Sequence, residues 1–106
     1  MPKYLFQASY TQEGLQGLLK EGGTQRREVV ANLAAALGGS VEAFYYAFGD
    51  HDIYVIADLP DDATATAASL VVGASGAGSV KTTVLIPPET VDDATAKAVN
   101  YRPPAS

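Results

Sequence analysis

The segment Ser40–Leu59 constrains the fold more than any other part of this chain. Its two halves, residues 41–48 and 53–59, are rich in aromatic and β-branched residues, a composition typical of strands. Only the turn-forming sequence Gly-Asp-His-Asp at 49–52 separates them, and a link this short joins antiparallel neighbours. The sequence therefore predicts a β-hairpin that carries the chain's only histidine and most of its aromatic side chains.

A strand and an interrupted helix are predicted before this hairpin. Residues 1–10 are apolar with partial alternation, which indicates a strand. Thr11 is placed to cap a helix through its hydroxyl, and the Gly-Gly pair at 22–23 interrupts that helix because glycine weakens a helical turn. Thr24 offers a second cap, and the Gly-Gly pair at 38–39 ends the second helical stretch.

A helix and a strand are predicted after the hairpin. The Pro-Asp-Asp sequence at 60–62 favours a helix start, because carboxylates near a helix N-terminus oppose the helix dipole. The helix is expected over about 63–74 and the strand over 80–86, where two prolines at 87–88 end it. A short terminal helix is expected over 92–99.

The resulting order, strand-helix-strand-strand-helix-strand, is that of a ferredoxin-like α+β fold. Such a fold has a four-stranded antiparallel sheet with both helices on one face. A chain of 106 residues forms one domain. We expect the domain over 1–90 and a C-terminal extension and tail over 91–106.

Both faces of the predicted sheet are apolar. Alternation places Ile53 and Val55 of the third strand on one face, and Tyr54 and Ile56 on the other. The same alternation divides the second strand into Phe44, Tyr46 and Phe48 on one face and Val41, Ala43, Tyr45 and Ala47 on the other.

Two helices cover only one face, so the other face is left as a contiguous apolar patch. We expect a second subunit to pack sheet to sheet on this open face and form a homo-oligomer. The alternative is that the C-terminal segment folds back over it.

Charge and composition limit the partners of this chain. The net charge of −5 argues against nucleic acid or an anionic membrane surface as a partner. There is no cysteine for a disulfide or a sulfur metal site, and no apolar run of ~20 residues for a membrane span. We expect a cytoplasmic protein without a cofactor.

Three sequence segments resemble the GYD-domain family of small bacterial and archaeal proteins: GLQGLLKEGGTQRREVV, GGSVEAFYYAFGDHDIYVIADLPDD and GAGSVKTTVLIPPE. Gly49, His51 and Asp52 match the family's Gly-x-Tyr-Asp signature, with His51 in place of the tyrosine. The resemblance covers about residues 3–90. It implies a ferredoxin-like fold related to dimeric α+β barrels, and the family has no established general activity that could be carried over to this chain.

His51 is the candidate catalytic residue. An imidazole oriented by a neighbouring carboxylate, such as that of Asp52, acts as a general base near neutral pH. The structural interpretation is that 49–52 simply forms a hairpin turn. Asp50, His51 and Asp52 also have the donor atoms of a zinc site, but one histidine and no cysteine leave that site incomplete, and we predict no metal.

Polar and aromatic side chains on the strands are the candidate ligand-binding residues. Such side chains orient a small organic ligand in a pocket. The predicted set, drawn from all four strands and the turn, is Gln7, Ser9, Tyr46, Asp52, Tyr54 and Lys81. The structural interpretation is that the aromatic residues pack against helices and that Lys81 is the solvent side of an edge strand.

The leading functional hypothesis is a small oligomeric binding or accessory protein with a small-molecule pocket near the subunit interface. The alternative is a cofactor-independent enzyme of the dimeric α+β barrel type, with His51 as general base on a small organic substrate. This alternative depends on fold-level analogy. A third hypothesis is a structural building block of a ring or shell, and a trimer would favour a PII-like regulatory arrangement.

Overall fold

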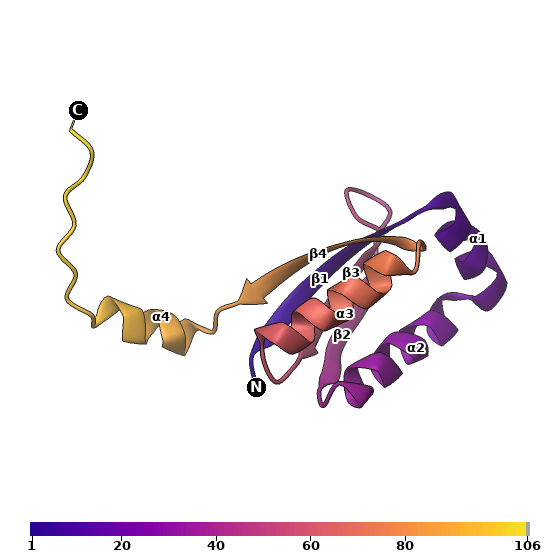
Figure 1. The fold of residues 1–106 in the computed structure, drawn as a ribbon, viewed down its shortest axis with the longest axis horizontal. Helices are drawn as coiled ribbons and strands as arrows, with labels where there is room; N and C mark the ends of the chain where they lie inside the picture. The colour runs from indigo at the N-terminus through magenta and orange to yellow at the C-terminus, as the bar shows by residue number, and fades with distance from the viewer. Residues whose placement is uncertain (106) are drawn as a thin grey trace.

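A computed structural model describes residues 1–105 and contains one four-stranded sheet in the order β2-β3-β1-β4. All its strand pairs are antiparallel. The elements are β1 (Lys3–Tyr10), α1 (Gln12–Glu21), α2 (Gly23–Ala36), β2 (Ser40–Tyr46), β3 (Ile53–Asp58), α3 (Asp62–Ala74), β4 (Gly78–Leu85) and α4 (Pro88–Thr95). The predicted ferredoxin-like α+β fold is confirmed (Figure 1).

Side-chain caps fix the starts of two helices. The Thr11 hydroxyl accepts a hydrogen bond from the Gly14 amide at 3.2 Å, and the Asp61 carboxylate accepts one from the Thr64 amide at 2.8 Å. Both caps satisfy amides that have no partner inside the helix. The prediction that Thr24 caps α2 is wrong, because Gly22 takes a φ of 83° and is itself the N-cap.

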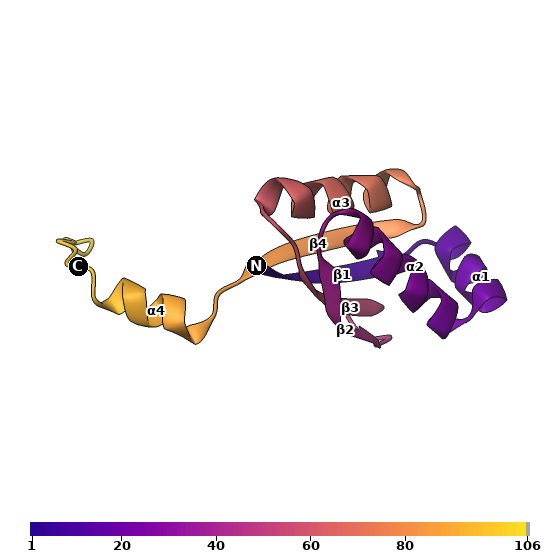
Figure 2. The ribbon, with the colours of Figure 1, turned by 90° about the horizontal axis from the view of Figure 1, so that it is seen from below.

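The helices form a single layer. Helix α2 contacts β2 and helix α3 contacts β4, and Figures 1 and 2 show both helices on the same side of the sheet. Within residues 1–105, the other side carries no helix. We call it the open face; the side chains of Leu5, Gln7 and Ser9 point to it from β1, because Tyr4 and Phe6 pack on the helical side.

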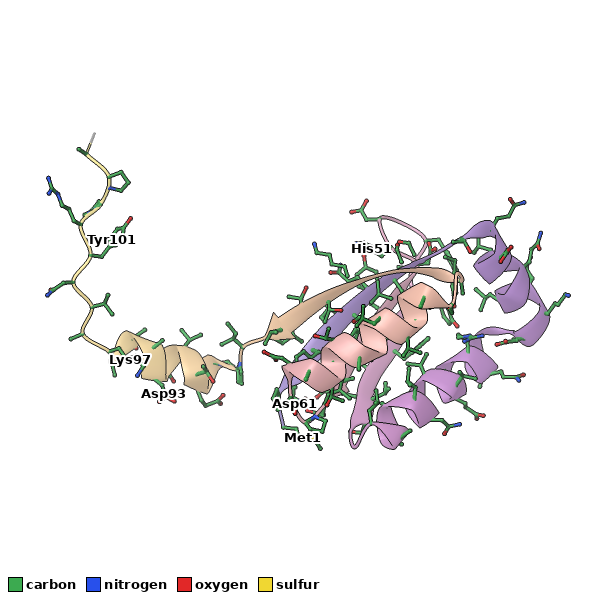
Figure 3. All side chains as sticks on the ribbon, viewed as in Figure 1. Met1, His51, Asp61, Asp93, Lys97 and Tyr101 are labelled. Atoms are coloured by element: carbon green, nitrogen blue, oxygen red, sulfur yellow. The ribbon has the colours of Figure 1, made fainter. Side chains whose placement is uncertain are left out.

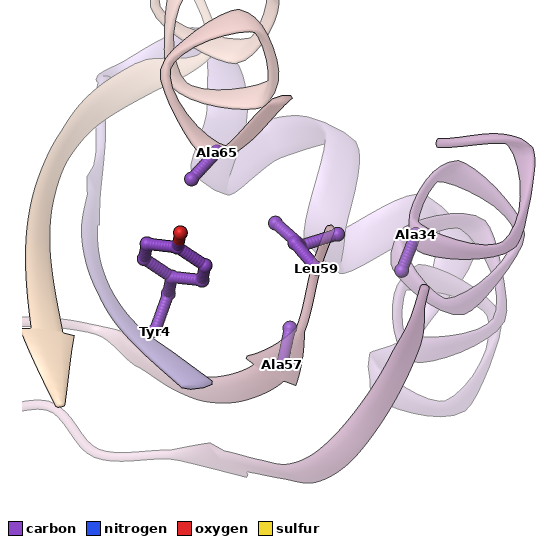
Figure 4. Close-up of a cluster of buried hydrophobic side chains, with 5 residues drawn as sticks. All are labelled: Tyr4, Ala34, Ala57, Leu59 and Ala65. Atoms are coloured by element: carbon purple, nitrogen blue, oxygen red, sulfur yellow. The ribbon is translucent and has the colours of Figure 1, made fainter. Parts of the chain in front are cut away.

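The core lies under the helical layer and is small. Tyr4 and Leu59 are each 1% exposed, and Ala34 of α2 and Ala65 of α3 pack near them (Figure 4). The Tyr4 hydroxyl donates a hydrogen bond to Asp62 Oδ1 at 2.6 Å, and this bond raises the pKa of Tyr4 to about 12. The largest buried side chain therefore also ties β1 to the first turn of α3.

Strand β2 departs from strict alternation. Its pairing with β3 shifts between Val41 and Ala43, which leaves Glu42 as the extra residue of a bulge. Val41 consequently packs against the core, whereas the alternation placed it on the same face as Ala43. The hairpin link is also longer than predicted, since β2 ends at Tyr46 and β3 begins at Ile53.

Helix α4 stands apart from the sheet and the other helices, as both Figure 1 and Figure 2 show. It begins at Pro88, earlier than the predicted start at 92. The C-terminal segment therefore does not fold back over the open face of its own chain, and the described part of the chain leaves that face uncovered. Within residues 1–105, no helix combines the length and the apolar character needed to cross a bilayer.

Two glycines of α1 give a matched test of the helix position. A Cβ at Gly14 would overlap the carbonyl oxygen of Ala77, whereas a Cβ at Gly17 would have nothing within 4 Å. We predict that Gly14→Ala lowers the free energy of unfolding by about 1–3 kcal/mol, because the backbone must move. Gly17→Ala raises it by up to about 1 kcal/mol, because alanine is the better helix former. Urea unfolding measures both; equal effects would contradict the close contact of α1 with residue 77.

Candidate functional site

Strand β1 lies in the centre of the sheet and brings predicted site residues together. In the strand register Gln7 lies opposite Tyr54 of β3 and opposite Lys81 of β4. Ser9 lies two residues further along β1 and points to the same side. Four of the predicted ligand-binding residues therefore share the open face on three adjacent strands.

His51 joins this group from the β2–β3 loop. Its Nδ1 lies 3.2 Å from the Ser9 hydroxyl oxygen, within hydrogen-bond distance. Its ring is edge-on to that of Tyr54, with centroids 6.0 Å apart and an interplanar angle of 83°. The imidazole is half-buried, and Figure 3 shows it at the end of the sheet remote from α4. We call Gln7, Ser9, His51, Tyr54 and Lys81 the open-face cluster.

Asp52 has a structural role in this arrangement. Its carboxylate Oδ2 accepts a hydrogen bond from the Tyr10 amide at 2.8 Å. Its own amide donates to the Ala8 carbonyl at 2.8 Å, and its carbonyl accepts from the Ala47 amide at 2.9 Å. Asp52 thus holds the loop against β1, and among the described residues no hydrogen bond joins it to His51. The carboxylate expected to orient the imidazole is hydrogen-bonded to the Tyr10 amide instead.

Tyr46 lies on the opposite face of the sheet. Its hydroxyl donates to the Gly23 carbonyl at 3.1 Å, which ties β2 to the start of α2. Burial raises the pKa of Tyr46. The pKa of Tyr10 is raised well above its ordinary range, mainly by burial and to a smaller extent by the neighbouring Tyr46. The structure therefore separates Tyr46 from the other predicted ligand-binding residues.

The two lysines of the open face differ in their ion pairing. Lys3 forms ion pairs with Asp58 at 3.0 Å and Glu42 at 3.1 Å, and hydrogen bonds to these two carboxylates raise the pKa of Lys3. Lys81 is exposed and forms no ion pair with any described residue. The open-face cluster therefore includes an unpaired ammonium group beside an imidazole, a hydroxyl, an amide and a phenol. These groups are suited to hold an anionic or hydrogen-bond-accepting ligand.

A cleft on the helical face was not predicted from the sequence. It has a volume of about 440 Å³ and lies between the sheet and helices α2 and α3. Its floor and walls are mostly apolar, and Val29 and Val71 are exposed at its surface. The volume of this cleft depends on how far apart α2 and α3 lie, which no local sequence pattern specifies. In the part of the chain described, no three histidine, cysteine or acidic side chains gather as metal ligands.

The strand order and the single helical layer define a ferredoxin-like α+β domain. The family model of the GYD domain matches residues 4–95. The chain therefore belongs to the GYD domain family, as the resemblance implied. No curated protein and no solved structure matches the chain.

The neighbouring residues Asp50 and Asp52 provide a test of the loop anchor. We predict that Asp52→Ala lowers the free energy of unfolding by about 1–3 kcal/mol, because the Tyr10 amide loses a charged acceptor. Asp50 is exposed, and Asp50→Ala is expected to change stability by less than about 0.5 kcal/mol. Thermal and urea unfolding of the two variants measure the difference. Equal stability of both would show that Asp52 does not anchor the loop.

Proposed function

We propose that this protein is a cytoplasmic, homo-oligomeric binding or accessory protein whose small-molecule site forms where two open faces meet. The observation that carries this proposal is the open-face cluster, in which His51 Nδ1 lies within hydrogen-bond distance of the Ser9 hydroxyl and the His51 ring is edge-on to that of Tyr54. A flat sheet face cannot enclose a ligand alone, because binding sites are concave. A second copy supplies the missing wall.

Apolar side chains beside the cluster support a subunit contact. Leu5 pairs with Ile56 across β1 and β3, and Tyr45 pairs with Tyr54 across β2 and β3. Tyr45 is 71% exposed. Removing these side chains from water by packing them against a second copy is favourable, since apolar burial drives association.

The open face is too small to form a stable interface by itself, so a further segment of the chain is needed in the subunit contact. Four strands spaced by ~4.8 Å and about eight residues long give a footprint of roughly 500 Å². A stable interface buries about 800 Å² on each partner, so the sheet alone falls short. Residues of the C-terminal segment, Val91, Val99 and Tyr101, are also exposed. A helix as short as α4 is unstable in water without packing. Both arguments favour docking of α4 against the partner subunit.

The geometry favours binding over proton transfer by His51. The carboxylate expected to orient the imidazole, that of Asp52, accepts a hydrogen bond from the Tyr10 amide instead. The remaining neighbours of His51 are a hydroxyl and a phenol, which position a ligand through hydrogen bonds. We therefore assign His51 and Ser9 to ligand positioning and Lys81 to charge recognition.

A charged substitution on each face tests the assembly. We predict that Ile56→Lys yields a monomer, because a charge in the centre of the open face opposes sheet-to-sheet packing. Leu19→Lys is the matched control, since Leu19 is 86% exposed on α1, away from that face. Light scattering during size-exclusion chromatography measures both masses. An Ile56→Lys protein with the same mass as the unaltered chain would contradict the proposed interface.

A second comparison tests the ligand site. We predict that small carboxylic acids raise the melting temperature of the unaltered protein, because binding to the native state stabilises it. Lys81→Ala abolishes this shift, and Lys20→Ala on α1 preserves it. A panel of such acids in a thermal-shift assay provides the measurement. The ligand proposal fails if no acid shifts the melting temperature, or if the Lys81→Ala protein shifts as much as the unaltered one.

A further inference from the structure

The cleft between α2, α3 and the sheet lies on the opposite side of the sheet from the open-face cluster. We propose that this cleft is a second binding site, specific for an uncharged and mostly apolar small molecule. The proposal does not depend on the proposed function, because none of its supporting contacts involves the open face.

The cleft stays open because each helix is fixed to a different edge of the sheet. At the β2 edge, the Tyr46 hydroxyl donates to the Gly23 carbonyl at the start of α2. At the β4 edge, the hydroxyls of Ser69 in α3 and Thr82 in β4 are hydrogen-bonded to each other. Between these attachments, the central strands β1 and β3 form the floor of the cleft.

The side chains that face the cleft are too small to fill it. Helix α3 contributes Ala68 and Ser69 beside Val72, whereas a fully packed core would place larger residues there. The volume of about 440 Å³ falls in the range of about 300–1,000 Å³ typical of small-molecule sites. The floor and the α2 wall are carbon-rich and consist chiefly of Phe6, Ala8, Val55, Val30 and Leu33.

The lining of the cleft argues against a charged ligand, because most of it is apolar and its carboxylate, that of Glu13, is exposed to solvent. Glu13 and Arg26 are the charged residues among the described side chains that line it. The Arg26 guanidinium donates to both carboxylate oxygens of Glu21, at 2.8 and 2.9 Å, so its charge is already neutralised. An anion would therefore lack a free cationic partner and would lose its hydration on entry.

Tyr10 gives this mostly apolar cleft a buried hydroxyl. Its ring forms part of the wall, and its hydroxyl is buried without a hydrogen-bond partner among the described residues. Buried hydroxyls in native proteins are normally bonded, so this one marks a place for an acceptor. A phenol is protonated at neutral pH and can donate a hydrogen bond, and burial raises the pKa of Tyr10 further. A ligand with a carbonyl or ether oxygen on an apolar frame fits these requirements.

Nile red, an uncharged fluorophore with a carbonyl, is a suitable probe. We predict that it binds the unaltered protein with a blue shift and gain of emission. Ala68→Phe should weaken binding at least tenfold, because the added ring occupies the cleft. Ala67→Phe is the matched control: Ala67 is the preceding residue on α3, is exposed and does not line the cleft. Circular dichroism verifies that both variants fold.

Two further measurements separate this site from the open face. The Ile56→Lys protein should bind Nile red with unchanged affinity. In the unaltered protein, nuclear Overhauser contacts should join the dye to the methyl groups of Val55 and Val72. The proposal is overturned if Nile red does not bind, if Ile56→Lys abolishes binding while Ala68→Phe preserves it, or if the dye contacts side chains of the open face instead.

Discussion

The coverage of a four-stranded sheet by a single helical layer is the constraint on which the rest of this structure depends. Helices α2 and α3 protect one face, where Tyr4 is anchored to Asp62 and forms the centre of a small core. On the opposite face Leu5, Tyr54 and Ile56 are half-buried and Tyr45 is exposed. The helices therefore cover one side of the sheet only, and the other side carries the polar open-face cluster beside apolar residues such as Leu5 and Ile56.

Strand β1 contributes side chains to both faces of the sheet. Its alternate residues Gln7 and Ser9 supply the open-face cluster, while Phe6 and Ala8 form the floor of the cleft on the helical face. Its backbone also receives the Asp52 anchor that holds the His51 loop in place. One central strand thus carries polar side chains on the open face and apolar side chains under the helices, which gives the two proposed sites different ligand chemistry.

Local signals in the sequence were sufficient to predict the fold and most of the open-face cluster. Gln7 and Tyr54 were predicted as ligand-binding residues and lie opposite each other on β1 and β3, and the Thr11 cap was correct. The position of Val41 was missed because alternation does not encode a bulge. Tyr46 was grouped with the other aromatics by residue type, although alternation had placed it opposite Tyr45. The cleft depends on the spacing between helices, which no local pattern contains.

The central claim, that the open face meets a second copy, is tested most directly by sedimentation equilibrium of the unaltered chain at micromolar concentrations. The account predicts a mass that is a whole multiple, two or greater, of the 11.0 kDa chain. A single species of 11.0 kDa at every concentration would contradict it, because the apolar side chains of the open face would then be stable in water without a partner.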